Sequence, residues 1–275
     1  MNQQPLVSII IPTYNSEATV KNCLESIKKQ TYKNIETIVV DGFSRDKTTN
    51  IIKEYGTKLI KIKGERTKAK NIGLKHAKGK YVLFIDSDME LTPKVVEECV
   101  SLAKLNPRIG GIIIPEKSAG EGFRARGKGF ERSFYEKTPI ESARFFRKDL
   151  VLRAGGYDED IIFFEESTLP HKIEKLGYST KARITSYIIH NEGYFSLRKQ
   201  IMKKYYYSKT AWRYVKKYRG YGKQKMDPIY RIILFIRNKK FYSEPHLSLG
   251  ILILKMLEYT VSVLGYLIGK WDSNG

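Results

Sequence analysis

Cysteines, acidic residues and the common zinc and nucleotide motifs are scarce or missing in this chain of 275 residues. The two cysteines, Cys23 and Cys99, lie in helix-like patterns without zinc-ligand spacing, so we expect reduced, buried side chains in a cytosolic protein. None of the four histidines stands beside a cysteine, and no H-E-x-x-H occurs, which excludes the usual zinc motifs. The absence of G-x-G-x-x-G excludes the common dinucleotide-binding fingerprint.

Two further absences concern targeting and phosphate binding. The N-terminus lacks a basic region and its apolar stretch is interrupted by Pro12, so no signal peptide is expected. Residues 122–129 (GFRARGKG) nearly match a P-loop, but Gly129 stands where that loop needs a Ser or Thr hydroxyl. We therefore predict a flexible basic loop for this stretch.

Acidic residues are few relative to basic ones: 29 Asp and Glu stand against 50 Lys and Arg, for a net charge of +21. Such an excess indicates a polyanionic partner: nucleic acid, an anionic membrane or a phosphorylated substrate. Residues 198–240 hold fifteen Lys and Arg but one acid, Asp227, and residues 247–269 are almost wholly apolar. We therefore predict a first domain of residues 1–195 and a helical C-terminal region, basic and then apolar, of residues 196–275.

The first domain alternates apolar strand-like runs with helical patterns. The predicted strands are residues 6–11, 35–40, 58–62, 81–85 and 109–114. This alternation predicts an α/β fold with a mostly parallel central sheet and helices on both faces. Ligands of such sheets bind at the carboxyl ends of the strands, where Thr13, Asp41 and Asp86 are expected.

The strand 81–85 ends in two carboxylates, Asp86 and Asp88, on either side of Ser87. An unpaired carboxylate is costly to bury, so the pair is expected where the strand leaves the sheet. Strand side chains repeat every two residues, which predicts that both carboxylates lean to the same side. Two hard oxygen ligands suit Mg²⁺ or Mn²⁺, ions that share their ligand shell with substrate phosphates. A surface Asp-x-Asp turn is the alternative.

Several motifs together resemble one known family. They are residues 8–15 (SIIIPTYN), 39–48 (VVDGFSRDKT), 69–74 (AKNIGL), 84–88 (FIDSD), 143–148 (ARFFRK), 155–159 (GGYDE), 164–169 (FEESTL), 177–178 (GY) and 189–191 (IHN). In this order they are similar to family 2 glycosyltransferases, inverting enzymes of the glycosyltransferase A (nucleotide-diphospho-sugar transferase) fold. The resemblance covers roughly the first 195 residues.

The resemblance implies a donor site for a UDP- or GDP-linked sugar. Its donor-binding residues would be Pro12, Thr13, Tyr14, Asp41, Lys70, Asp86 and Ser87. The first four would hold the nucleotide base. Lys70 replaces an arginine and would face the diphosphate as a point charge without a bidentate fork. The usual Asp-Asp-Gly-Ser reads Asp41-Gly-Phe-Ser44 here, which removes one acid near the nucleotide.

The resemblance also implies a metal site and a catalytic base. Asp86, Asp88 and His190 would hold Mg²⁺ or Mn²⁺, although a hydrogen-bonded histidine at a strand end is an equal alternative for His190. Glu166 takes the position of the base that inverting transfer requires. The alternative is that Glu165 and Glu166 are first-turn acids of a helix over residues 168–176, favoured by the helix dipole.

The basic and apolar pattern of the C-terminal region indicates contact with a membrane. Leu197, Ile201, Tyr205, Ser208, Trp212 and Val215 recur at helical spacing among lysines, which predicts one basic amphipathic helix with interfacial aromatics. Residues 247–269 could span a bilayer by length, but Lys255 and Glu258 argue against spanning. Shallow insertion with these two residues toward water, or a buried helix covering the first domain, are the alternatives.

We therefore expect a metal-dependent, inverting hexosyltransferase at the cytoplasmic face of a membrane, acting on a polyprenyl phosphate or diphosphate acceptor. Two other classes stay open. Eight tyrosines among the bases of residues 205–242 could form an RNA-binding module, although no RNA-binding motif is present and no nucleic acid is expected as partner. A sugar nucleotidyltransferase could share the core, but it typically carries a Gly-rich signature where Pro12-Thr-Tyr-Asn stands.

Overall fold

The computed structural model describes residues 4–120, 122–192, 196–218, 220–221 and 226–273. By compactness the chain divides into two units. The first comprises Met1–Glu116, Ser142–Glu159 and Glu165–Asn191; the second comprises Lys117–Glu141, Asp160–Phe164 and Glu192–Gly275. The second unit thus contains two internal segments besides the predicted C-terminal region, and a single domain boundary after residue 195 stays a prediction.

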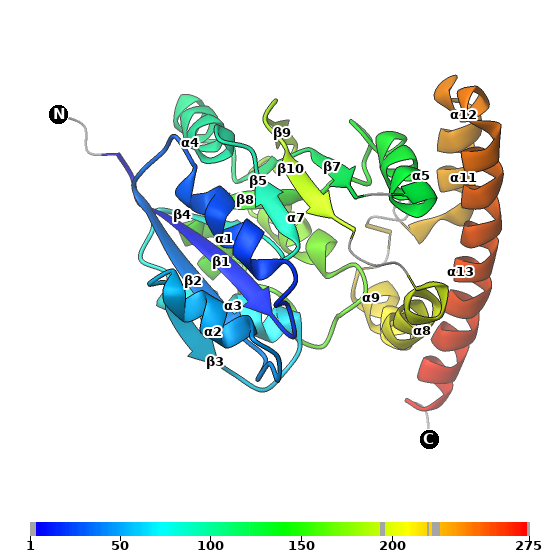
Figure 1. The fold of residues 1–275 in the computed structure, drawn as a ribbon, viewed down its shortest axis with the longest axis horizontal. Helices are drawn as coiled ribbons and strands as arrows, with labels where there is room; N and C mark the ends of the chain where they lie inside the picture. Colours follow the sequence, from blue (N-terminus) through cyan, green and yellow to red (C-terminus); the bar gives the residue numbers. More distant parts are fainter. Residues whose placement is uncertain (1–3, 121, 193–195, 219, 222–225, 274–275) are drawn as a thin grey trace. The chain divides into compact units, whose positions relative to one another are not determined.

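A seven-stranded sheet forms the centre of the first unit, in the order β3-β2-β1-β4-β8-β6-β9 (Figure 1). Its strands are β1 (Val7–Thr13), β2 (Ile35–Asp41), β3 (Lys58–Lys61), β4 (Tyr81–Phe84), β6 (Gly111–Ile113), β8 (Ala143–Arg147) and β9 (Ala182–Arg183). The first four run parallel, and β8 is antiparallel to both β4 and β6. The predicted α/β fold with a mostly parallel sheet is confirmed.

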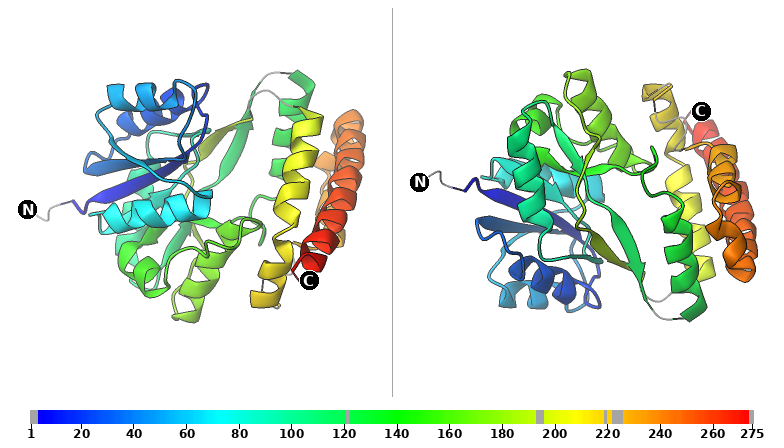
Figure 2. Two further views of the ribbon diagram at one scale, coloured as in Figure 1. Left: turned by 90° about the horizontal axis from the view of Figure 1, so that it is seen from below. Right: turned by 90° about the horizontal axis from the view of Figure 1, so that it is seen from above.

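Helices cover both faces of this sheet because the side chains of β1 alternate between them. Ile9 and Ile11 pack with α1 (Val20–Lys28), α2 (Thr48–Glu54) and α4 (Val95–Leu105). Ile10 lies on the other face and packs with α3 (Arg66–His76), α6 (Lys148–Arg153) and α7 (Glu165–Lys175) (Figure 2). A short strand, β5 (Met89–Leu91), pairs antiparallel with β10 (Ile188–Asn191) and places His190 opposite Met89. β7 (Glu116–Ala119) leads from the first unit into the second.

The second unit is helical. Its helices are α5 (Gly122–Ser133), α8 (Leu197–Ser208), α9 (Ala211–Lys217), α11 (Pro228–Ile236), α12 (Lys240–Ser243) and α13 (Pro245–Trp271). Figures 1 and 2 show α8 running beside α13. Two predictions are wrong here: residues 122–129 form the start of α5 instead of a loop, and the basic region after residue 196 forms two helices, α8 and α9, instead of one.

Burial of Lys255 and Glu258 contradicts the expectation that they face water, since the two residues are 5% and 2% exposed. Lys255 Nζ lies 2.6 Å from Glu131 Oε1 on α5 and 2.7 Å from Glu258 Oε2, and Gln200 of α8 donates to Glu258. The charges can be buried because each has an opposite charge or a donor as partner. Glu131 precedes Lys255 by nearly half of the chain, and no local sequence pattern predicts such a pairing.

Candidate active site

The carboxyl ends of β1 and β2 fix the carboxylate of Asp41. Parallel pairing sets Thr13 opposite Asp41, and the Thr13 hydroxyl donates to Asp41 Oδ1 over 3.0 Å. The Ser44 hydroxyl also donates to Oδ1, over 2.5 Å, and the Ser44 backbone N–H donates to Oδ2 over 2.8 Å. Asp41 is fully buried and has a fixed orientation, with one acceptor position of Oδ2 left over after these bonds.

Two aromatic side chains lie exposed beside this carboxylate, at the ends of the same strands. Tyr14 is 63% exposed and Phe43 is 53% exposed, while Pro12 is half-buried. Phe43 has a φ of +61°, which is uncommon for a side chain larger than glycine, and strained backbone of this kind concentrates at functional sites. The loops after β1 and β2 therefore offer flat apolar surfaces next to a polar anchor, an arrangement suited to a planar heterocycle.

Asp86 lies in the turn between β4 and β5, and so the predicted strand period does not set its direction. Its Oδ1 is 3.8 Å from Lys70 Nζ, and its Oδ2 is 3.9 Å from Arg144 Nη1. Burial favours the protonated form, but the charges of Lys70 and Arg144 outweigh it and hold the pKa of Asp86 well below its usual range. Ser87 reaches the loop after β1 by donating to the hydroxyl of Ser16 over 2.8 Å.

A chain of contacts connects Asp86 to Asp88 through other strands. The guanidinium of Arg144 donates from Nε to Glu116 Oε1 over 2.7 Å. Glu116 Oε2 lies 3.5 Å from His190 Nδ1, and His190 Nε2 lies 3.3 Å from Asp88 Oδ2. His190 is therefore held from both ring nitrogens, in agreement with the hydrogen-bonded alternative, although a metal ion could replace its contact with Asp88.

Asp88 alone is better placed to bind a divalent metal ion than the predicted set of Asp86, Asp88 and His190 together. Within the described ranges, no three His, Cys, Asp or Glu side chains converge to hold a metal ion. However, Asp88 Oδ1 is buried without a hydrogen-bond partner among the described residues, and such an atom requires an explanation. Mg²⁺ commonly binds one or two carboxylates and takes its remaining ligands from water and substrate phosphates. A site that the donor diphosphate completes fits this arrangement.

The adjacent carboxylates Glu165 and Glu166, in the first turn of α7, have different surroundings. Glu165 is buried, and its Oε1 lies 3.0 Å from Lys70 Nζ while its Oε2 accepts from Arg66. Burial lowers the pKa of Lys70, but the carboxylates of Glu165 and Asp86 outweigh it and raise that pKa. Glu166 is half-buried, and its side chain has no hydrogen bond or ion pair with any described residue. Its carboxylate is therefore available to a substrate.

Three charged residues of this site carried no predicted role: Arg66, Glu116 and Arg144. Arg66 opens α3 four positions before Lys70, and helical spacing could have suggested that both face the same acid. Arg144 lies within the motif of residues 143–148, but the motif alone gives it no partner. Glu116 has no local signal, because its partners come from β8 and β10.

Comparison with known proteins identifies relatives along most of the first unit. The family described as "Glycosyl transferase family 2" matches residues 8–156. An uncharacterized glycosyltransferase of Haemophilus influenzae is 30% identical over 201 residues, which cover 64% of this chain and 68% of that protein. Another, RP339 of Rickettsia prowazekii, is 42% identical over 101 residues, which cover 36% of this chain and 32% of that protein.

Solved structures share the fold at low identity. The mannosyltransferase PcManGT from Pyrobaculum calidifontis, in complex with GDP-Man and Mn²⁺, has a TM-score of 0.61 at 18% identity. That alignment covers 98% of this chain and 88% of PcManGT. TarS residues 1–349 from S. aureus, in complex with UDP-GlcNAc, have a TM-score of 0.54 at 17% identity, covering 98% of this chain and 91% of that one.

Proposed function

This chain belongs to glycosyl transferase family 2 and is a glycosyltransferase, and from that premise we propose an inverting sugar transfer from a nucleotide diphosphate donor to a lipid-linked acceptor. The observation that carries the proposal is the position of Asp41, Asp86 and Asp88 at the carboxyl ends of β2 and β4, where α/β sheets bind ligands. The nucleotides bound by PcManGT and TarS support a UDP- or GDP-linked donor.

Donor binding uses residues of the β1, β2 and β4 ends. The nucleotide base lies beside Tyr14 and Pro12, and its N–H donates to the remaining acceptor position of Asp41, which Thr13 orients. Lys70 is almost fully buried and lies between Glu165 and Asp86, so it adds a fixed positive charge near the diphosphate. Ser87 lies between Asp86 and Asp88 in the turn after β4, and its hydroxyl donates to Ser16 in the loop after β1. This position puts Ser87 beside the proposed diphosphate site.

Asp88 is the principal protein ligand of Mg²⁺ or Mn²⁺ in this proposal, with Asp86 and His190 as neighbours in reach. When bound, the ion supplies charge neutralisation on the leaving diphosphate. The positive charges of Arg144 and Lys70 favour the ionised form of Asp86, so that a second carboxylate is available to the metal ion. These two cations also reduce the repulsion between Asp86 and Asp88.

Glu166 acts as the base. It removes the proton from the acceptor hydroxyl while that oxygen attacks the anomeric carbon, and the bond from this carbon to the diphosphate oxygen breaks on the opposite face. One displacement inverts the anomeric configuration. Glu165 cannot take this role because Lys70 and Arg66 occupy both of its oxygens.

The acceptor is a polyprenyl phosphate or diphosphate sugar, reached at the cytoplasmic face of a membrane. Exposed basic side chains of the second unit, with the apolar face of α13, support contact with anionic lipid. Free, buried Cys23 and Cys99 agree with a reducing compartment.

Incubation with UDP-, GDP- and dTDP-sugars, with Mn²⁺ and a polyprenyl diphosphate sugar whose hydroxyl can act as acceptor, tests the proposal. Release of nucleoside diphosphate and an inverted glycolipid is expected. Release of pyrophosphate instead indicates a nucleotidyltransferase, and no release with any donor contradicts the proposed donor class.

A further inference from the structure

The two faces of α13 are the reverse of those of an ordinary surface helix. By length and composition α13 could cross a membrane. Five of its seven buried residues are polar, charged or glycine: Ser248, Lys255, Glu258, Gly265 and Gly269; the other two are Leu247 and Ile251. Its exposed stripe, at intervals of three and four residues, is apolar except for Thr260: Leu249, Ile253, Met256, Thr260, Val263, Leu267 and Trp271. Charged residues normally face water, so this inversion indicates that the outer face meets a medium other than water.

Contacts within the second unit fix α13 along its length. In the N-terminal half of α13, Lys255 forms an ion pair with Glu131 of α5. Near its C-terminal end, a Cβ added to Gly265 would come within 2.7 Å of the carbonyl oxygen of Tyr205 on α8, and a Cβ added to Gly269 would come even closer to the carbonyl oxygen of Lys209. Such close backbone approach requires glycine. A bilayer-spanning α13 would have to leave these partners or take the charged helices α5 and α8 into lipid with it.

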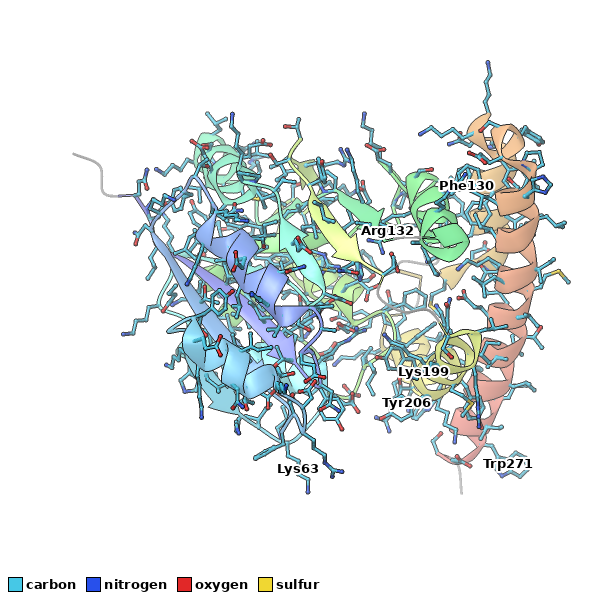
Figure 3. All side chains as sticks on the ribbon, in the orientation of Figure 1. Lys63, Phe130, Arg132, Lys199, Tyr206 and Trp271 are labelled. Atoms are coloured by element: carbon cyan, nitrogen blue, oxygen red, sulfur yellow. The ribbon has the colours of Figure 1, made fainter. Side chains whose placement is uncertain are left out.

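The surroundings of the apolar stripe carry positive charge. A second apolar stripe on α11 exposes Ile229, Ile233 and Ile236. Phe235 of α11 packs in one cluster with Ile251 of α13. The exposed bases Lys239, Lys240 and Lys270 belong to the same unit, and residues 192–275 hold 17 Lys and Arg against 5 acids. Trp271, 82% exposed, projects from the end of α13 (Figure 3).

We propose that α13 lies in the plane of an anionic bilayer, with its apolar stripe in the headgroup and acyl boundary, and does not span it. This inference rests on the membrane association in the proposed function. The occupant is lipid because apolar, aromatic and basic side chains together match an anionic interface, where each base near the surface adds attraction. A helix of 27 residues is ~40 Å long, more than the ~30 Å hydrocarbon thickness, and all of its exposed stripe can lie at one depth only when it is in-plane.

Spin labels on single added cysteines measure depth in the full-length protein. Cys23 and Cys99 are fully buried, so labels attach at introduced positions: Leu249→Cys, Met256→Cys, Val263→Cys and Leu267→Cys. Collision rates with oxygen and with a water-soluble nickel chelate are measured on phosphatidylcholine–phosphatidylserine vesicles. We expect one shallow depth for all four labels, while a label at Leu105→Cys, an exposed leucine of α4, stays in water.

Each other outcome overturns the inference in a distinguishable way. A depth that changes steadily along α13 means that the helix spans the bilayer. If the protein floats with the vesicles but the labels on the apolar stripe stay in water, another surface binds lipid, and the proposed membrane association stands. Protein that does not float contradicts both. Labels shielded from the chelate without vesicles mean that a second copy covers the stripe.

A matched pair of variants checks the energetic role of the stripe. Leu249→Glu with Met256→Glu removes exposed apolar side chains of α13 and should weaken vesicle partitioning by at least ~10-fold. Leu105→Glu with Leu152→Glu makes the same change at exposed residues of the first unit and should leave partitioning within about twofold. Equal effects of the two double variants would overturn the proposal.

Discussion

Glu165 and Glu166 are adjacent carboxylates in different surroundings, so each predicts a different variant. Glu166→Gln removes the only available proton acceptor of the pair but keeps its size. Donor affinity should stay the same while turnover falls by at least ~10²-fold, the lower end of base catalysis. Calorimetric donor binding and single-turnover kinetics measure the two effects. Normal turnover would show that Glu166 is not the base, as would be the case for an acceptor phosphate that is already ionised.

Glu165→Gln is the matched comparison and should act on stability. Its carboxylate compensates two buried or half-buried cations, Lys70 and Arg66. Removing that charge should lower the free energy of unfolding by ~3–5 kcal/mol. A thermal melt of unchanged midpoint would contradict the ion-pair role.

Asp88→Asn tests the metal ligand without changing side-chain volume. The side chain of Asp88 is 42% exposed, so the melting temperature should change little. Mn²⁺ should no longer increase the affinity for UDP or GDP, because an amide is a poorer ligand than a carboxylate. Calorimetry with and without Mn²⁺ measures this, and Glu90→Gln on β5 is the control. An undiminished Mn²⁺ effect in Asp88→Asn would refute the assignment.

Single residues show how far the sequence could predict the site. The positions of Asp41, Asp86 and Asp88 follow from the strand pattern, because polar residues at strand ends are visible locally. The predicted metal triad stays a prediction, and in the structure Asp86 and His190 also contact Arg144 and Glu116, which the sequence did not predict. Such contacts join strands far apart in the sequence, and no local pattern encodes them.

Helix α13 provides a prediction at the scale of the element. Lys255→Met leaves Glu258 buried without its ion pair and Glu131 with Lys128 alone, so it should lower the free energy of unfolding by ~3–5 kcal/mol. Lys270→Met, on the same helix but exposed, should cost ~0.5 kcal/mol or less. Urea denaturation measures both. Similar values for the two variants would mean that the buried pair adds nothing.

Glu98 on helix α4 predicts that the stability of the fold depends on pH. Burial opposes ionisation of Glu98, but hydrogen bonds from Ser186 and Thr185 outweigh it and lower the pKa of Glu98 to about 2 from 4.5. This lowered pKa stabilises the fold above about pH 4.5, and the contribution is lost as the pH falls toward about 2. Glu98→Gln should therefore flatten the loss of stability over this window. A parallel decline in both proteins would contradict the assignment.

The elements themselves were predicted unequally. Strands β1 and β4 follow from apolar runs because each is buried on both faces, and the second half of β2 is buried in the same way. Helix α5 was not predicted because three glycines in residues 122–129 have low helix propensity and favour a loop. In the structure, Glu131 of α5 pairs with Lys255, and Phe134, just after α5, packs against Phe235 and Ile251. Packing overrode the local preference.

For the whole molecule, salt should distinguish two contributions to membrane binding. Flotation with anionic vesicles should be complete at low salt and weakened, but not abolished, at high salt, because salt screens the bases and leaves apolar contacts intact. Neutral vesicles are the control and should bind weakly at every salt concentration. Complete loss at high salt would mean that the apolar stripe does not insert.

The pairing of α5 with α13 also has a consequence for synthesis on the ribosome. Glu131 leaves the ribosome roughly 120 residues before Lys255, a delay of roughly 6–25 s at typical elongation rates. During that time Glu131 has Lys128 of its own helix, but not Lys255, as an ion-pair partner. The second unit therefore completes its packing only after α13 has emerged, whereas most of the first unit's sheet is already available. The nascent chain thus acquires its proposed lipid-binding surface after most of the sheet of the first unit.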